Sequence, residues 1–358
     1  MELFLYAISL VYGGAVKLRG NCYHRGIYRL RQLPCVVLSI GNITVGGTGK
    51  TPTAMYVARL LQRLKLKPAV ISRGYRGSAE KDLGIVSTGK KVLMTPETAG
   101  DEPFMMATNL SGIPVVVGQN RYDAGALAIR EFDPDVLVLD DAFQHQKLHR
   151  DIDIVLLDYL KPFGNHHLLP RGPLREPISS MLRGDAFIRT RFSRRHGENG
   201  MEYQKTFERF SQGKPVFKSS HVPRIFKETH GKLSPYRFDF SNMRDAYAFS
   251  GIARNSDFRD TLTDLGCHLK GFSEFPDHHA YQKKDLEKIL ISAQKTTAEC
   301  IITTEKDFTR IPKHMEWPTD LFVIGIEVDF GDDTDRFHHF IEKEVQTALD
   351  QKQRQGGI

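Results

Sequence analysis

A lysine and a threonine follow a run of glycines early in the chain, and together these residue types can bind a polyphosphate. Residues 41–53 read GNITVGGTGKTPT. Glycines let successive backbone N–H groups face an anion, and a helix that begins there adds its partial positive charge. Lys50 would contact the β- and γ-phosphates, and the Thr51 hydroxyl would bind Mg²⁺. The pattern predicts a nucleotide site made of Thr44, Val45, Gly46, Gly47, Thr48, Gly49, Lys50 and Thr51.

One position departs from the strict phosphate-loop motif, because Thr44 stands where the first glycine is expected. Gly46 and Gly47 supply flexibility inside the loop instead. The alternative to a phosphate loop is a glycine-rich turn with an incidental lysine. The position of Gly-Lys-Thr between an expected strand and an expected helix favours the phosphate loop.

Two carboxylates stand at the end of a later apolar run, VLVLDD, at residues 136–141. Enzymes with a phosphate loop use an acid at such a strand end to hold Mg²⁺ or its water. Asp140 and Asp141 are therefore the candidate metal ligands beside Thr51, and the sequence leaves open which of them lies nearer to the metal. Gln144 and His145 follow closely enough to line the same cleft.

These residues need a sheet to position them, and the apolar pattern predicts one. Short apolar runs at 35–40, 69–71, 115–117, 136–139 and 154–157 alternate with helical patterns at 53–64 and 121–132. Strands separated by helices are typical of a parallel sheet buried on both faces. The predicted fold class is α/β, a P-loop NTPase-type parallel sheet covered by helices on both faces. We expect residues 31–200 to form this core.

The pattern loosens after residue 189. Residues 191–215 are rich in charge, Gly and Ser and resemble a connector. Further strands are expected at 246–249, 300–303 and 321–326, with helices at 256–265 and 284–293. We expect residues 201–350 to form a second, smaller α/β lobe, and the tail at 351–358 to fray.

The N-terminus differs from the rest of the chain in charge and hydropathy. The whole chain carries a net charge of +7, and residues 1–79 hold twelve Lys or Arg but one acid, Glu2. This asymmetry favours a polyanionic partner: anionic lipid, a phosphorylated substrate or nucleic acid. Residues 3–16 are apolar almost throughout, which is shorter than the ~20 residues of a bilayer span. We expect residues 1–30 to form a membrane-interface helix with a basic flank; a core helix packed on the main domain is the alternative.

The cysteines and the motifs argue against a disulfide-bonded protein, a zinc protein and a nucleic-acid-binding protein. The four cysteines are scattered without a CxxC pair, which indicates a reducing compartment without structural disulfides or a zinc site. No recognition-helix or RNA-binding motif accompanies the basic charge, so no nucleic-acid partner is expected.

Several short stretches together resemble one family, the tetraacyldisaccharide 4'-kinases. The stretches are GNITVGGTGKTP, ISRGYRG (71–77), AGDEP (99–103), DDAFQHQKLHRDIDIVLLD (140–158), LLPRGPLREP (168–177), FPDHHAY (275–281) and TTEKD (303–307). The resemblance implies ATP-dependent transfer of the γ-phosphate to the 4'-hydroxyl of a tetraacylated glucosamine disaccharide 1-phosphate in lipid A biosynthesis, with ATP and Mg²⁺ as cofactors. It also implies a peripheral or monotopic protein on the cytoplasmic face of the inner membrane, and we expect a monomer.

The resemblance further implies which residues act on the acceptor. Asp101 in AGDEP and His278 in FPDHHAY match a pair thought to activate the sugar hydroxyl, and a positioned proton acceptor would help such a poor nucleophile. Lys50 and Arg73 would neutralise charge on the transferring phosphoryl group, with Arg171 a weaker candidate. Two other functions stay open at this point: a kinase of another sugar, and a membrane-associated P-loop ATPase switch.

Overall fold

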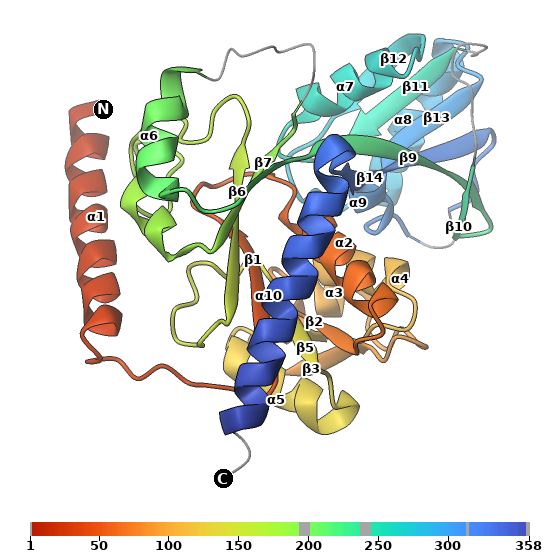
Figure 1. Ribbon diagram of the computed structural model, residues 1–358. Helices are drawn as coiled ribbons and strands as arrows, with labels where there is room; N and C mark the ends of the chain where they lie inside the picture. The colour runs from red at the N-terminus through yellow and green to blue at the C-terminus, as the bar shows by residue number, and fades with distance from the viewer. Residues whose placement is uncertain (1, 193–200, 237–244, 313–314, 356–358) are drawn as a thin grey trace. The chain divides into compact units, whose positions relative to one another are not determined.

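The computed structural model describes residues 2–192, 201–236, 245–312 and 315–355 (Figure 1). The chain forms two compact units: unit 1 comprises Met1–His221 and Val328–Ile358, and unit 2 comprises Val222–Glu327. Unit 2 is therefore an insertion into the chain of unit 1. This division differs from the predicted one, because the prediction assigns residues 201–221 and 328–350 to the second lobe, whereas they belong to unit 1.

Unit 1 is built on an eight-stranded sheet with the order β3-β4-β2-β5-β1-β6-β7-β8. Its neighbouring strands run parallel except for the antiparallel pair β3 and β4. The predicted P-loop NTPase-type sheet is confirmed by this order. The strands are β1 (Val36–Asn42), β2 (Pro68–Ser72), β3 (Gly84–Ser87), β4 (Val115–Val117), β5 (Val136–Asp140), β6 (Ile152–Asp158), β7 (Ala186–Thr190) and β8 (Val216–Lys218).

Helices cover both faces of this sheet. They are α2 (Lys50–Arg63), α3 (Pro96–Ala99), α4 (Asp101–Asn109), α5 (Arg121–Phe132), α6 (Met201–Ser211) and α10 (Thr334–Gln355), with short 3₁₀ segments at Ser78–Glu80, Ile178–Arg183 and Gly331–Asp333. Helix α1 (Glu2–His24), all of whose residues the structure describes, contributes none of them to the apolar clusters of this sheet. Alternate side chains of β1 enter different clusters: Val36 and Leu38 pack with α2 and α10, and Val37 packs with α5. Burial on both faces explains why this strand is a continuous apolar run.

Unit 2 contains the six-stranded sheet β10-β9-β14-β13-β11-β12, and both chain crossings between the units fall within β9 and β14. Strands β11, β12, β13 and β14 pair in parallel, whereas β9 and β10 are antiparallel. The elements are β9 (Ser220–Thr229), β10 (Lys232–Pro235), β11 (Ala246–Ser250), α7 (Asn255–Asp264), β12 (Leu269–Glu274), α8 (Lys283–Lys295), β13 (Cys300–Thr304), α9 (Glu305–Phe308) and β14 (Asp320–Asp329). The predicted strands and helices of this lobe are confirmed.

Two local predictions differ from the structure. The expected connector at 191–215 contains helix α6, whose Phe207 is buried against Phe187 of β7. The expected frayed tail is helical as far as Gln355. The rest of these two predictions, at residues 193–200 and 356–358, lies outside the described residues.

Helix α1 lies on the surface of unit 1 and is not a core helix, because Ser9 and Gly13 are its buried residues. Gly13 faces Leu168, and the Tyr12 hydroxyl donates to Arg175 O at 2.8 Å. The opposite side exposes apolar side chains, among them Leu3 at 83% and Val11 at 75%. Among the described residues, no helix has the length and apolar character that crossing a membrane requires.

Helix α10 is fixed to unit 1 at both ends. Near its start, Phe337 stacks on Phe330 with ring centroids 4.0 Å apart. Near its end, Lys352 Nζ donates to Leu33 O at 3.0 Å and lies 3.3 Å from Asp151 Oδ1. Asp151 Oδ2 also accepts from Val37 N–H of β1 at 2.8 Å. One carboxylate, with 10% of its side chain exposed, thus joins α10 to β1.

The substitution Asp151→Asn should therefore lower the free energy of unfolding by about 2 kcal/mol, because a charged, hydrogen-bonded partner is lost. Burial raises the pKa of Asp151, but hydrogen bonds from His149 and Val37 and the charge of Lys352 outweigh burial, so the net pKa is lowered. A lowered folded pKa stabilises the protein above the unfolded value of about 3.9, and this stabilisation is lost as pH falls through the folded pKa.

Urea unfolding of the wild type and Asp151→Asn should consequently differ at pH 7 and converge in acid. Asp133→Asn is the matched control, since Asp133 pairs with Lys67 at 3.4 Å while its side chain is 92% exposed. An exposed pair of this kind contributes little. Equal losses in the two variants would contradict the anchoring role of Asp151.

Candidate active site

The phosphate loop lies between β1 and α2, where the sequence predicts it. Gly46 has φ of +106° and Gly49, which precedes α2, has φ of +82°. Positive φ favours glycine, which explains Gly46 and Gly49 but not Gly47. Thr44 instead forms an isolated antiparallel bridge with Leu174. This bridge requires extended backbone, which threonine adopts readily, and accounts for the absence of glycine there.

The loop residues face the two acids at the carboxyl ends of adjacent strands. β1 and β5 pair in parallel with Ile40 opposite Asp140, so the end of β5 lies beside the last residues of β1. The Thr51 hydroxyl donates to Asp140 Oδ2 at 3.2 Å, and both residues are buried. Lys50 Nζ lies 3.9 Å from Asp141 Oδ1 and 3.4 Å from Gly46 O. The structure thus brings Lys50, Thr51, Asp140 and Asp141 together.

The two carboxylates differ in electrostatic environment. Burial raises the pKa of Asp140 to about 7, and the charges of Glu102 and Asp141 act in the same direction. Burial also disfavours ionised Asp141, but Lys50 and Arg175 outweigh it and lower the pKa of Asp141. Asp140 Oδ1 is buried and has no hydrogen-bond partner among the described residues. An ionised Asp140 would therefore gain from a cation that binds beside Thr51.

Two arginines that were not singled out from the sequence belong to this site. Arg175 Nη1 contacts both Asp141 oxygens, at 2.8 and 2.9 Å. Arg121, at the start of α5, is 4% exposed; burial lowers its pKa to about 10, and the charges of Asp141 and Asp140 oppose this. The weaker candidate Arg171 points elsewhere, because its guanidinium lies 4.7 Å from the Tyr6 ring centroid. Arg121 begins the helix that follows the third expected strand, at residues 115–117. Its position after a strand end is the signal in the sequence that points to this site.

The predicted cleft residues Gln144 and His145 also lie at this end of the sheet. Gln144 Nε2 donates to Asn42 O at the end of β1, at 2.7 Å. Burial, with the charge of Arg121 next in size, lowers the pKa of His145 to about 4. The ring is therefore neutral at pH 7, and its buried Nε2 has no hydrogen-bond partner among the described residues.

The AGDEP and ISRGYRG motifs pack backbone against backbone in unit 1. A Cβ at Gly100 would lie 2.7 Å from Tyr75 O, and one at Gly77 would lie 2.5 Å from Gly100 N. Asp101 follows directly as the first residue of α4. Arg73 Nε forms an ion pair with Glu80 Oε1 at 2.7 Å, while its side chain is 48% exposed. Arg73 is thus paired with an acid here and accessible to solvent.

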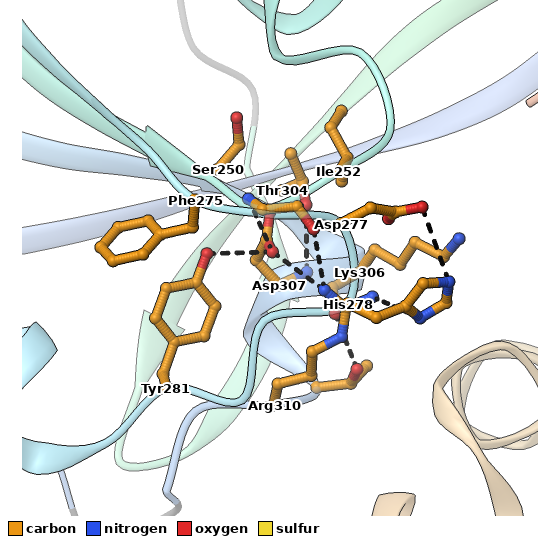
Figure 2. Close-up of polar contacts among 12 residues, drawn as sticks. Ser250, Ile252, Phe275, Asp277, His278, Tyr281, Thr304, Lys306, Asp307 and Arg310 are labelled. Atoms are coloured by element: carbon orange, nitrogen blue, oxygen red, sulfur yellow. Dashed lines mark hydrogen bonds and ion pairs between the residues drawn. The ribbon is translucent and has the colours of Figure 1, made fainter. Parts of the chain in front are cut away.

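His278 belongs to unit 2, whereas Asp101 belongs to unit 1, so their pairing stays a prediction. Figure 2 shows His278 among Asp277, Lys306, Asp307 and Arg310. Its Nε2 lies 3.8 Å from Asp277 Oδ2, and its Nδ1 lies 3.4 Å from Arg310 Nη2.

The neighbouring His279 has a different environment from His278. Its ring stacks on Phe275 at 4.7 Å, and its Nε2 lies 3.0 Å from Asp285 Oδ2. These contacts are those of a structural histidine.

Comparisons with known proteins agree on one family over almost the whole chain. A family model described as tetraacyldisaccharide-1-P 4'-kinase matches residues 1–346. A relative from Desulfatibacillum aliphaticivorans named tetraacyldisaccharide 4'-kinase is 41% identical over 349 residues, which cover 96% of this chain and 92% of the relative. Another of that name, from Syntrophus aciditrophicus (strain SB), is 43% identical over 85% of this chain and 83% of its own length.

A solved structure supports the same conclusion. The crystal structure of LpxK from Aquifex aeolicus in complex with ATP has a TM-score of 0.77 to this chain and 31% sequence identity. The match covers 96% of this chain and 99% of that one.

Proposed function

Since the chain belongs to the tetraacyldisaccharide-1-P 4'-kinase family, we propose that its phosphate loop holds Mg·ATP and directs the γ-phosphate to a lipid-linked disaccharide at a membrane surface. The chain is an ATP-dependent kinase that phosphorylates the 4'-hydroxyl of a tetraacylated glucosamine disaccharide 1-phosphate in lipid A biosynthesis. The observation that carries the proposal is the position of Lys50 and Thr51 beside Asp140 and Asp141 at the ends of adjacent parallel strands.

Residues 44–51 would hold the nucleotide phosphates. Backbone N–H groups of the loop and of the first turn of α2 suit an anion, and Lys50 would contact the β- and γ-phosphates. The Asn42 side-chain amide donates to Thr48 Oγ1 at 2.9 Å, and Val45 N–H donates to Pro173 O at 2.7 Å. These two hydrogen bonds hold the loop from both sides. The loop therefore loses less conformational entropy when it binds the phosphates.

The donor set at the end of β5 fits Mg²⁺, which prefers oxygen ligands and is commonly held by one or two protein groups plus substrate phosphates. Thr51 Oγ1 and Asp140 would hold the ion, and Asp140 Oδ1 is a buried oxygen without a hydrogen-bond partner among the described residues. Asp141 is neutralised by Lys50 and Arg175, so Asp140 is the nearer ligand in this proposal. When bound, Mg²⁺ neutralises charge that develops on the phosphoryl oxygens.

Asp101 and His278 would together activate the 4'-hydroxyl, since a positioned acid–base pair can take the proton of a sugar hydroxyl. One observation in unit 1 supports the place of Asp101. Glu102, the next residue of α4, acts electrostatically on Asp140, so the start of this helix lies toward the metal-binding end of the sheet. Arg73 would leave Glu80 and contact the transferring phosphoryl group instead. Its ion pair with Glu80 is partly exposed to solvent, so breaking it costs little free energy.

Helix α1 would keep the enzyme at the membrane. Its exposed apolar side suits the headgroup region, where such helices lie with their apolar face buried. A hollow of about 720 Å³ after its last turn is lined by Tyr23, Tyr28, Arg29, Arg31 and Lys147, among others. Cations and tyrosines are the side chains that suit an anionic lipid interface. We place the enzyme on the cytoplasmic face of the inner membrane, as a peripheral or monotopic monomer.

The combined substitution of Leu3, Phe4 and Val11 by glutamine should weaken binding to anionic phospholipid vesicles by at least about tenfold, because three exposed apolar side chains no longer leave water. Vesicle sedimentation of the full chain measures this. The matched control replaces Leu83, Val92 and Leu93, which are exposed apolar residues elsewhere in unit 1, by glutamine. Equal vesicle binding of both triple variants would contradict the role of α1.

The proposed function is tested by transfer of the ATP γ-phosphate to a tetraacylated disaccharide 1-phosphate in detergent micelles. We expect a lipid product with Mg²⁺ present, and none when the acceptor already carries a 4'-phosphate. Hydrolysis of ATP without any lipid product from a folded protein would favour the P-loop ATPase switch. Transfer to a sugar that carries no acyl chains, but not to the lipid, would favour a kinase of another sugar.

A further inference from the structure

The loop that carries His278 is folded closely around Gly251. The His278 backbone is left-handed, with φ of +61°, and its N–H donates to Gly251 O at 3.1 Å. A Cβ at position 251 would lie 3.0 Å from Pro276 O and 3.2 Å from Asp307 Oδ1. This close approach favours glycine and fixes the loop, and the His278 side chain is 16% exposed.

Asp307 is the centre of a polar network behind this loop (Figure 2). Its carboxylate is fully buried and accepts hydrogen bonds from Gly251 N–H at 3.0 Å and the Tyr281 hydroxyl at 3.0 Å. The Thr304 hydroxyl donates to it at 2.6 Å, and Arg310 Nη1 lies 3.3 Å away. A buried carboxylate is stable only when hydrogen-bond donors or cations surround it. These contacts therefore fix the positions of the side chains around Asp307.

Arg310 connects the network to the imidazole of His278. The arginine side chain is 4% exposed, and its Nη1 also donates to Gly251 O at 3.0 Å. Two acceptors therefore hold one side of the guanidinium, while its Nη2 lies 3.4 Å from His278 Nδ1. A guanidinium has hydrogen-bond donors and no acceptor. His278 Nδ1 must therefore accept the hydrogen bond with its lone pair. A neutral ring with this bond carries its proton on Nε2.

We propose that Arg310 is a positioning residue for His278: it orients the imidazole and keeps the proton on Nε2. This inference rests on the proposed role of His278 in activating the acceptor hydroxyl. Arg310 acts through His278 and does not itself touch the reacting atoms. Loss of the arginine would leave nucleotide binding intact and slow the chemical step, because proton transfer depends on the alignment of the groups involved.

The first test is ¹⁵N NMR of the full chain labelled at histidine, with the His278 signals identified by their loss in His278→Gln. The expected spectrum of the wild type has a non-protonated Nδ1 and a protonated Nε2 at His278. In Arg310→Met the two tautomers should mix. A wild-type ring protonated on Nδ1 would overturn the proposal, whether or not any Arg310 variant folds.

The second test separates positioning from a structural role by kinetics. Arg310→Met should lower kcat by ~10²-fold with KM for ATP unchanged, the size expected when a reacting group is misplaced. Arg310→Lys should recover part of kcat, because lysine keeps the charge beside Asp307 and one donor. Arg259→Met is the matched control in unit 2, since Arg259 is half exposed and paired with Glu274.

An unchanged kcat in folded Arg310→Met would overturn the positioning role. Failure of the proposed function would give a different result: His278→Ala would turn over normally, while the tautomer of the wild-type ring stayed as stated.

Discussion

Lys50→Ala should lower kcat for phosphorylation of the lipid acceptor by ~10²–10³-fold, the loss typical of removing one group that stabilises transition-state charge. Lys50 Nζ lies within the loop, 3.4 Å from Gly46 O, and its side chain is 12% exposed. Alanine would remove the cation that faces the transferring phosphoryl group and leave Asp141 with the positive charges of Arg175 and Arg121. Product formation in micelles and nucleotide binding should be measured separately, because both depend on this ammonium.

Lys90→Ala is the matched control for Lys50→Ala. Lys90 is an exposed lysine of unit 1 that follows β3, outside the phosphate loop. Its loss should leave kcat unchanged, since surface substitutions seldom have large effects. Near-normal turnover in folded Lys50→Ala would remove the phosphate loop from the mechanism.

Asp101→Ala and His278→Ala should each lower kcat by ~10²–10⁴-fold, the contribution typical of a positioned acid–base group. ATP affinity should change little, because neither residue belongs to the phosphate loop. Turnover in micelles and the dissociation constant for Mg·ATP measure the two effects independently.

The double variant decides whether Asp101 and His278 act as a pair. Residues that act as a unit are strongly non-additive, so the double variant should be no slower than the slower single one. Additive losses would indicate independent roles and contradict the pairing. His279→Ala serves as the control: it removes the ring stacked on Phe275 and paired with Asp285, so it should lower stability but not the kcat of the folded protein.

Local patterns in the sequence were sufficient to predict that the loop at 44–51 lies beside Asp140 and Asp141, while the binding roles of these residues stay predictions. Gly46 and Gly49 are glycines because their φ angles are positive, and the apolar run of β5 ends at Asp140 because the strand ends there. Both facts depend on a few neighbouring residues. The parallel order of the strands then follows from their alternation with helices. A site built from neighbouring strand ends can therefore be located without knowledge of distant contacts.

Residues that reach the site from distant segments were not predicted. Arg175 contacts Asp141 across 34 positions of the sequence, and nothing near Arg175 distinguishes it from Arg171. The pattern at 191–215 indicates a connector, because its stretches RFSRRHGENG and SQGK are rich in charge, Gly and Ser. Tyr203, Phe207 and Phe210 recur at helical spacing within α6 and pack in one cluster. The insertion of unit 2 was also missed, because composition does not show that α10 returns to the first sheet.

That return has a consequence for how the protein is made. Phe337, Ile341 and Val345 of α10 share one apolar cluster with Val36 and Leu38 of β1, so this face of the first sheet is covered only in part, by α2 and α4, until α10 has been synthesised. Unit 2 is continuous in sequence and complete by residue 327, whereas unit 1, which begins first, finishes last. Closing so long a loop is slow, and an uncovered apolar face invites aggregation. A chain released early would thus carry an intact phosphate-loop sequence on a sheet with one face only partly covered.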